Sequence, residues 1–242
     1  MSRRDQIAAN LARVRARIAE ACARTGRDPG EVTLVAVTKT FPAADVLHLA
    51  ALGVLDIGEN RDHEAAPKAQ AVATAGGRVR WHFVGQLQRR KCRSVTTYAD
   101  VVHSVDSVRL AQALRAAAER GGRPDGVLID VLVQVSLDRD PARGGAIVGS
   151  PAGNPDPDQD LDGVLEAVAT AGSLRLGGVM AIAPLEADPN RAFATLAEIA
   201  ARVRGRYPDA TAISAGMSGD LEAAIDHGAT HVRIGSALLG NR

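Results

Sequence analysis

Residues 32–39 of this chain read VTLVAVTK, an unbroken run of apolar and β-branched residues that ends in a lysine. A run without polar residues at alternate positions is typical of a strand buried on both faces of a parallel sheet. Lys39 then stands at the carboxyl end of this strand, where we expect burial to desolvate its amine in part. Desolvation favours the neutral amine, which reacts with aldehydes. The alternative is a lysine that extends past the rim of the sheet and has no chemical role.

The rest of the chain repeats the unit of strand and helix that this stretch begins. Expected strands cover residues 32–39, 54–58, 80–85, 101–106, 127–135, 174–180, 210–214 and 230–235. Expected helices include residues 108–119, 161–170, 191–203 and 220–227, and an amphipathic helix over residues 2–24 precedes the first strand. This alternation over 242 residues predicts an α/β fold, a (β/α)8 TIM barrel with an extra N-terminal helix. We expect one domain over residues 1–242, and a doubly wound open sheet is the alternative.

Composition and charge exclude several classes of function. The net charge is +1 and aromatic residues make up 2% of the chain, so we expect neither an electrostatic field nor a stacking surface for nucleic acid. No apolar stretch has the length of a membrane span, and the first residues do not resemble a signal peptide. Cys22 and Cys92 lack metal-ligand spacing, which indicates reduced thiols. We expect a cytoplasmic monomer that does not bind membranes.

Two loops after the last two expected strands are suited to bind phosphate. The loop of residues 214–219 reads SAGMSG and includes Ser214 and Gly216, while Gly235 and Ser236 follow the eighth strand. Small residues let backbone N–H groups approach an anion at the start of a helix. TIM barrels usually bind phosphate on these two loops, at the face formed by the carboxyl ends of the strands. We therefore expect a phosphate site on the same face as Lys39.

A phosphate site and a strand-end lysine together predict a phosphorylated aldehyde or ketone that is held as an imine. Pyridoxal 5′-phosphate (PLP) is the leading candidate, and a sugar phosphate bound as in class I aldolases is the alternative. Strand alternation places Arg233 and His231 on one face of the eighth strand, and we expect the charged Arg233 to face the barrel mouth. An arginine there would donate a hydrogen bond to a pyridine nitrogen and keep that nitrogen unprotonated. The ring would then be a poorer electron sink, which favours simple carriage of the cofactor or a limited range of reactions.

Seven short motifs occur along the chain. They are residues 35–40 (VAVTKT), 58–60 (GEN), 81–85 (WHFVG), 104–106 (SVD), 178–180 (GVM), 214–218 (SAGMS) and 232–236 (VRIGS). In sequence and in order they resemble the motifs of the pyridoxal phosphate homeostasis proteins, over almost the whole chain. The resemblance implies a barrel like the N-terminal domain of bacterial alanine racemase. It also implies carriage of PLP and vitamin B6 homeostasis, with PLP-dependent apoenzymes as partners and no established reaction.

The resemblance implies roles for individual residues as well. The residues expected to bind PLP are Lys39, Asn60, Ser214, Gly216, Arg233, Gly235 and Ser236. Lys39 would form a Schiff base with PLP, Arg233 would lie at the pyridine nitrogen, and Asn60 would lie beside the cofactor. Ser214, Gly235 and Ser236 would hold the phosphate, and Gly216 lies in the same loop as Ser214.

Three positions depart from the pattern of this family. Phe41 stands where a second lysine often follows the first, so we do not expect hand-over of PLP through that lysine. Arg61 replaces a tyrosine that commonly follows the GEN motif, and Gln86 replaces a proline that commonly follows the WHFVG motif. These differences concern loops beside the expected site and leave the Schiff-base lysine in place.

Two functional classes remain open, a non-catalytic PLP carrier and a racemase-like PLP enzyme with weak single-base activity. Alanine racemases take a second base, a tyrosine, from an additional C-terminal domain. We expect no such domain here, and neither Tyr98 nor Tyr207 falls at an expected strand exit. The carrier is therefore preferred. His82 and His103 lie within expected strands, where histidine is typically a hydrogen-bonded residue and not a catalyst.

Residues 158–163 (DQDLDG) match the first half of a calcium-binding loop. The twelfth position of such a loop carries a glutamate ligand, and here that position is Ala169. The match therefore fails, and we expect aspartates at the start of a helix and no metal.

Overall fold

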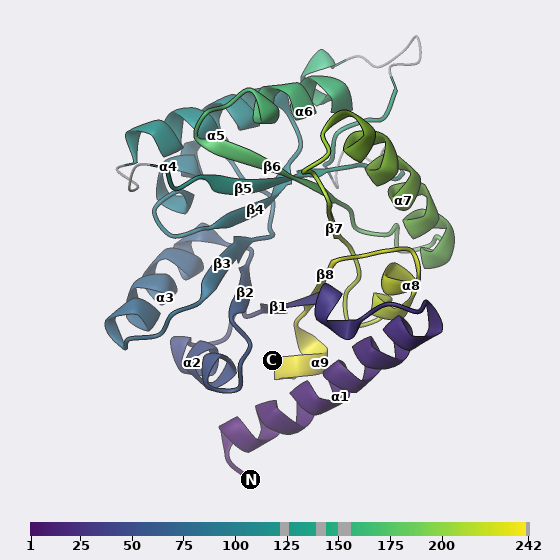
Figure 1. Ribbon diagram of the computed structural model, residues 1–242. Helices are drawn as coiled ribbons and strands as arrows, with labels where there is room; N and C mark the ends of the chain where they lie inside the picture. Colours follow the sequence, from purple (N-terminus) through teal and green to yellow (C-terminus); the bar gives the residue numbers. More distant parts are fainter. Residues whose placement is uncertain (122–125, 139–143, 150–155, 241–242) are drawn as a thin grey trace.

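The computed structural model describes residues 1–121, 126–138, 144–149 and 156–240. Within these residues, eight parallel strands pair in chain order and close into a barrel with helices around it (Figure 1). The strands are β1 (Thr33–Val37), β2 (Asp56–Glu59), β3 (Arg80–Phe83), β4 (Val101–Val105), β5 (Ile129–Gln134), β6 (Leu174–Met180), β7 (Ala212–Ser214) and β8 (His231–Ile234). The predicted TIM barrel is confirmed and the open sheet is wrong, because β1 pairs with β2 and also with β8.

Helices follow the strands and form the outer layer of the described part of the chain. They are α1 (Arg3–Arg24), α2 (Ala43–Ala51), α3 (Asp62–Thr74), α4 (Cys92–Val95), α5 (Val108–Arg120), α6 (Leu161–Ala169), α7 (Pro189–Arg206), α8 (Leu221–Asp226) and α9 (Ser236–Leu239). The extra helix predicted before the first strand is α1. Among the described residues, every helix is too short or too polar to cross a membrane.

The N-terminal helix α1 lies across the outside of the barrel, alongside α8 and α9 (Figure 1). Apolar residues at spacings of three and four, among them Leu11, Val14 and Ile18, give it one buried face. On the same face, the Asn10 side chain donates a hydrogen bond to the backbone oxygen of Leu238 at 2.9 Å. Helix α1 therefore supports α9, the short helix that follows the eighth strand.

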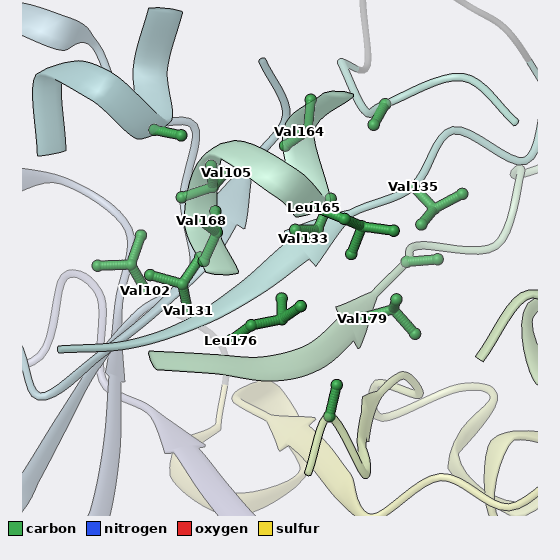
Figure 2. Close-up of a cluster of buried hydrophobic side chains, with 14 of the residues drawn as sticks. Val102, Val105, Val131, Val133, Val135, Val164, Leu165, Val168, Leu176 and Val179 are labelled. Carbon is green, nitrogen blue, oxygen red and sulfur yellow. The ribbon is translucent and has the colours of Figure 1, made fainter. Parts of the chain in front are cut away.

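Much of the apolar core lies between the barrel and the helix layer. Figure 2 shows Val131 of β5 beside Val168 of α6, and Val133 of β5 beside Leu165 of the same helix. Because successive strand residues point to opposite faces, Leu132 points the other way, into the barrel, where it packs with Met180. The strands are thus buried on both faces, as the apolar run at residues 32–39 predicts for a parallel sheet.

Candidate functional site

Four neighbouring strands bring the predicted site residues to one end of the barrel. In barrel order these strands are β7, β8, β1 and β2, and the residues lie at or just after their carboxyl ends. Asn60 directly follows β2, Ser236 follows β8 after one residue, and Lys39 lies two residues beyond β1. The side chain of Lys39 is exposed there. The expectation that the strand end buries and desolvates this amine is therefore wrong.

Helix α3 holds the backbone on both sides of Lys39. The Lys68 ammonium donates to the Thr38 carbonyl oxygen at 2.7 Å, and the Thr40 backbone N–H donates to the Glu64 carboxylate at 2.9 Å. Thr40 has a φ of 66°, a conformation that residues other than glycine adopt at a cost in free energy. These contacts fix the course of the chain as it leaves β1, and with it the place of Lys39 at the mouth.

A buried ion pair joins β2 to α3 beside the exit of β1. Glu59 Oε1 accepts hydrogen bonds from Lys68 Nζ at 2.5 Å and from the Thr38 hydroxyl at 2.6 Å. Burial raises the pKa of the Glu59 carboxyl, and the hydrogen bonds from Lys68 and Thr38 oppose this rise. Sequence analysis missed this pair. The signal that could have found it is the position of Lys68 on the apolar face of α3.

Asn60 places a buried polar group at this end of the barrel. Its side-chain oxygen is buried and has no hydrogen-bond partner among the described residues. A buried acceptor in this state costs free energy unless a ligand or water satisfies it. Gly85, after β3, approaches so closely that a Cβ at this position would lie 2.2 Å from the Asn60 carbonyl oxygen. Glycine is therefore required in the WHFVG motif for Asn60 to keep its place, and the free acceptor fits a polar ligand.

Arg233 points into the barrel, as strand alternation predicts, and is 5% exposed. Its Nη1 donates to Ser214 Oγ at 2.6 Å and its Nη2 donates to the Ala181 carbonyl oxygen at 3.0 Å. Burial lowers the pKa of the guanidinium to about 10, so the group remains charged at neutral pH. A guanidinium has five N–H donors, and these two bonds leave donors for an acceptor on a ligand.

The two predicted phosphate-binding loops contact one another. Ser218 Oγ lies 3.3 Å from Ser236 Oγ and accepts a hydrogen bond from the Ala237 backbone N–H at 3.3 Å. Gly216 has a φ of 88°, and a Cβ there would lie 2.7 Å from the side chain of Ala224. Glycine is therefore the residue that fits. Hydroxyl groups and small residues thus gather between the ends of β7 and β8.

The other two predicted phosphate ligands, Ser214 and Gly235, lie at the ends of the same strands. Gly235 separates β8 from α9. Ser214 is fully buried, and its hydroxyl oxygen lies 2.6 Å from Arg233 Nη1 and 3.0 Å from His103 Nδ1. Both contacts of the Ser214 hydroxyl are therefore made inside the barrel.

A line of polar side chains continues from Ser214 through the barrel. His103 Nε2 lies 2.8 Å from His82 Nδ1, and His82 Nε2 lies 2.8 Å from Asp56 Oδ1. The prediction that His82 and His103 are hydrogen-bonded residues is confirmed. Sequence analysis missed the links to Asp56 and Ser214, because these four residues come from four strands whose order in the barrel only the fold defines. Polar residues at alternate positions of the strands were the available signal.

Two of the positions that depart from the family pattern have contacts of their own. The Arg3 guanidinium carbon lies 5.5 Å from the centre of the Phe41 ring, and Arg3 pairs with Asp45 at 2.6 Å. Phe41 therefore contributes to the attachment of α1 next to the mouth. Arg61 pairs with Glu64 at 3.3 Å, on the first turn of α3.

Comparison with known proteins identifies the family. A family model for the alanine racemase N-terminal domain matches residues 3–242. A pyridoxal phosphate homeostasis protein of Mycobacterium leprae (strain TN) is 43% identical over 248 residues, which cover 98% of this chain and 93% of that protein. This chain belongs to the pyridoxal phosphate homeostasis protein family. The resemblance predicted from the seven motifs is therefore confirmed.

Solved structures are similar to this chain over most of its length. The structure of PipY of Synechococcus elongatus PCC7942 with PLP bound has 34% identity and a TM-score of 0.75, and the match covers 92% of this chain and all of PipY. Alanine racemase of Corynebacterium glutamicum has 17% identity and a TM-score of 0.67, and the match covers 97% of this chain and 60% of the racemase. This second likeness shows the fold alone, and it confirms the barrel predicted from alanine racemase.

Proposed function

We propose that this protein binds PLP at the barrel mouth and carries it as part of vitamin B6 homeostasis. The main support is the placement of an exposed lysine, a buried arginine and two Ser/Gly loops on four adjacent strands at one end of the barrel. The name of the M. leprae relative and the PLP bound to PipY point to the same cofactor. We further propose a single PLP-binding domain over residues 1–242, present as a monomer in the cytoplasm, with PLP-dependent apoenzymes as recipients.

Lys39 supplies the covalent attachment in this proposal. Its amine condenses with the aldehyde of PLP to a Schiff base, and water is released. Because this side chain is exposed, PLP can reach the amine and the released water can leave it. Asn60, directly after the neighbouring strand β2, offers beside the same position a buried side-chain oxygen that has no hydrogen-bond partner among the described residues.

Arg233 holds the pyridine ring of the cofactor. A guanidinium has only donors, so a pyridine nitrogen that binds it must accept a hydrogen bond and stays unprotonated. Such a ring withdraws electrons less well than a ring whose nitrogen is paired with a carboxylate. The pairing with Arg233 therefore suits a protein that stores and delivers the cofactor.

Gly216, Gly235 and Ser236 bind the phosphate in this proposal. The two glycines let the backbone approach an anion, and Ser236 adds a hydroxyl at the start of α9. The side chain of Ser214, which sequence analysis assigned to the phosphate as well, already contacts Arg233. We assign its hydroxyl to the support of Arg233.

A racemase-like activity is the second candidate, and the positions of the two tyrosines of the chain count against it. Tyr98 lies between α4 and β4, and Tyr207 lies between α7 and β7. Segments that lead from a helix into a strand lie at the end of the barrel opposite the site. Burial also raises the pKa of the Tyr98 phenol. The Tyr98 side chain packs between the barrel and the helix layer, and its hydroxyl donates a hydrogen bond to the Asp62 carboxylate of α3 at 3.5 Å. These positions and contacts count against a role for either phenol as the second base.

Titration of PLP into the purified apoprotein tests the proposal. We expect a visible absorption band at about one equivalent per chain for the wild-type protein and no such band for Lys39→Ala. Lys91→Ala is the control and should bind as the wild-type protein does, since the Lys91 ammonium pairs with Asp62 at 3.2 Å. A band of full size in Lys39→Ala would overturn the assignment.

Incubation of the PLP-loaded protein with L-alanine in deuterated water separates a carrier from an enzyme. A carrier should produce neither D-alanine nor α-deuterated alanine at enzymatic rates. Rapid inversion or exchange that disappears in Lys39→Ala would support the racemase-like activity instead.

A further inference from the structure

Five side chains form one continuous line of hydrogen bonds through the barrel. From the mouth inward they are Arg233, Ser214, His103, His82 and Asp56, and they come from β8, β7, β4, β3 and β2. The successive distances between their polar atoms are 2.6, 3.0, 2.8 and 2.8 Å. The three middle residues are at most 1% exposed, whereas the Asp56 side chain, at the start of β2, is 25% exposed. The line therefore connects the proposed PLP site to the opposite end of the barrel.

The two ends of this line fix the direction of its hydrogen bonds. Arg233 can only donate, so the Ser214 oxygen accepts from it. Burial by itself would raise the pKa of the Asp56 carboxyl, but the hydrogen bond from His82 and the charge of Arg80 bring it below its ordinary value. Asp56 is therefore ionised at neutral pH and can only accept. It follows that the hydrogen between them is on His82 Nε2.

With both ends fixed, one arrangement satisfies every group in the line with two neutral imidazoles. His82 carries its hydrogen on Nε2, so its Nδ1 accepts from His103 Nε2. His103 Nδ1 then accepts from the Ser214 hydroxyl. Burial, with the charge of Arg233, keeps the pKa of His103 well below its ordinary value, in agreement with a neutral ring. Every hydrogen in the line points away from Arg233 and toward Asp56.

A protonated His82 would reverse the middle of the line. His82 Nδ1 would donate to His103 Nε2, and His103 Nδ1 would donate to Ser214 Oγ. The oxygen of Ser214 would then accept two hydrogen bonds, and its own hydrogen would have no acceptor within the line. A buried hydroxyl donor without an acceptor costs free energy, so the neutral arrangement is favoured.

We propose that His103, His82 and Asp56 are positioning residues for the cofactor. They hold the Ser214 hydroxyl in one orientation, and the Ser214 oxygen in turn holds the Arg233 guanidinium for the pyridine nitrogen. This inference rests on the proposed PLP site. Of the five residues in the line, only Arg233 contacts the ring. A change at Asp56 should therefore alter binding at the mouth from the other end of the barrel.

Long-range ¹H–¹⁵N NMR spectra of the histidine rings test the direction of the line in the apoprotein, where PLP plays no part. We expect both rings to be neutral with their hydrogen on Nε2 at neutral pH. The signals are assigned by their loss in His82→Gln and His103→Gln. A hydrogen on Nδ1 of His103 in the wild-type protein would overturn the inference, whatever the result of the PLP titration.

The rate of PLP release tests the consequence at the mouth. Asp56→Ala should release PLP about fivefold faster than the wild-type protein, which is the effect of roughly one hydrogen bond. Asp56→Asn should release PLP at nearly the wild-type rate, because its amide oxygen still accepts the hydrogen bond from His82. Asp28→Ala is the control, since Asp28 also stands shortly before a strand, but its carboxylate accepts a hydrogen bond from the Gly30 backbone N–H at 2.8 Å. Equal release from Asp56→Ala and Asp28→Ala would overturn the positioning role. The proposed function is tested by a different experiment, the PLP titration, and it fails if Lys39→Ala keeps the full absorption band.

Discussion

The three lysines of the chain differ in what each ammonium contacts. Among the described residues Lys39 makes no ion pair, whereas Lys68 pairs with Glu59 at 2.5 Å and Lys91 with Asp62 at 3.2 Å. Lys68 is also 8% exposed, so an aldehyde cannot reach its amine unless the pair breaks. Lys39 combines exposure with an amine free of ion pairs in this part of the chain. That combination supports the proposed attachment of PLP to Lys39.

Replacement of Lys68 should destabilise the protein strongly. Lys68→Met leaves Glu59 buried with only the Thr38 hydroxyl as a hydrogen-bond donor, and we expect the free energy of unfolding to fall by about 3 to 5 kcal/mol in urea denaturation. The double variant Glu59→Gln with Lys68→Met removes both charges and should recover part of this loss. Lys91→Met should lose less free energy than Lys68→Met, because the Lys91 side chain is 40% exposed, although its partner Asp62 is buried. Equal losses in Lys68→Met and Lys91→Met would contradict this account.

Part of the candidate site could be predicted from single residues and part could not. The positions of Lys39 and Arg233 follow from the end of an apolar run and from strand alternation, which are local properties of the chain. The environment of Lys39 is not local, because the exposure of its side chain depends on how α3 packs against the exit of β1. The contact between Ser214 and His103 likewise depends on the closure of the barrel, which brings β4 and β7 face to face.

At the scale of elements, β6 contains an irregularity that shapes its pairing with both neighbours. Leu176 is opposite Val131 of β5 and Gly178 is opposite Leu132, so β6 has one extra residue between them. Gly178 has a φ of 149°, and a Cβ there would lie 2.0 Å from the Ala212 carbonyl oxygen of β7. Strand β7 can pair closely with β6 only because residue 178 has no side chain.

Gly178→Ala should therefore destabilise the barrel. The added carbon strains the backbone and pushes β7 away. We expect the free energy of unfolding to fall by about 3 kcal/mol, or the variant to fail to fold. Gly172→Ala is the control, because nothing lies within 4 Å of a Cβ at Gly172. Urea denaturation of the two variants measures the difference. If both variants matched the wild-type protein, the close approach of β6 and β7 would be incorrect.

The order and type of the elements could be predicted from the sequence better than their ends. The apolar run at residues 127–135 predicts a strand, yet β5 begins at Ile129, and Val127 and Leu128 are 48% and 40% exposed. Apolar character marks residues suited to burial, whereas strand ends depend on where the neighbouring strands offer partners. For the same reason the first strand, predicted to reach Lys39, ends at Val37, where the chain turns.

At the scale of the whole molecule, the closed barrel encloses a group of histidines. The ring of His231 lies 6.3 Å, centre to centre, from the rings of both His82 and His103. Burial lowers the pKa of His231 from 6.5 to about 4. The folded protein thus favours neutral histidine inside the barrel, whereas the unfolded chain takes up protons near the ordinary pKa.

The apoprotein should lose stability as the pH falls. Above pH 6.5 the His231 ring is neutral in both states and adds no pH dependence, and between pH 6.5 and about 4 protons bind the unfolded state more strongly. At about pH 5 this ring alone should lower the free energy of unfolding by about 2 kcal/mol. Urea denaturation at neutral pH and near pH 5 should show a smaller drop in His231→Gln than in the wild-type protein. His63→Gln is the control, because the His63 side chain is exposed, and its free energy of unfolding should fall as much as that of the wild-type protein. An equally large fall in His231→Gln would contradict the lowered pKa of His231.

Reduction of the PLP-loaded protein with borohydride, followed by mass spectrometry of its peptides, tests the central claim most directly. The reduction makes the attachment permanent, so each modified amine retains the mass of the cofactor. We predict a single modified peptide that contains Lys39, in an amount that matches the absorption lost on reduction. Modification of Lys68, Lys91 or the N-terminal amine with Lys39 unmodified would contradict the account.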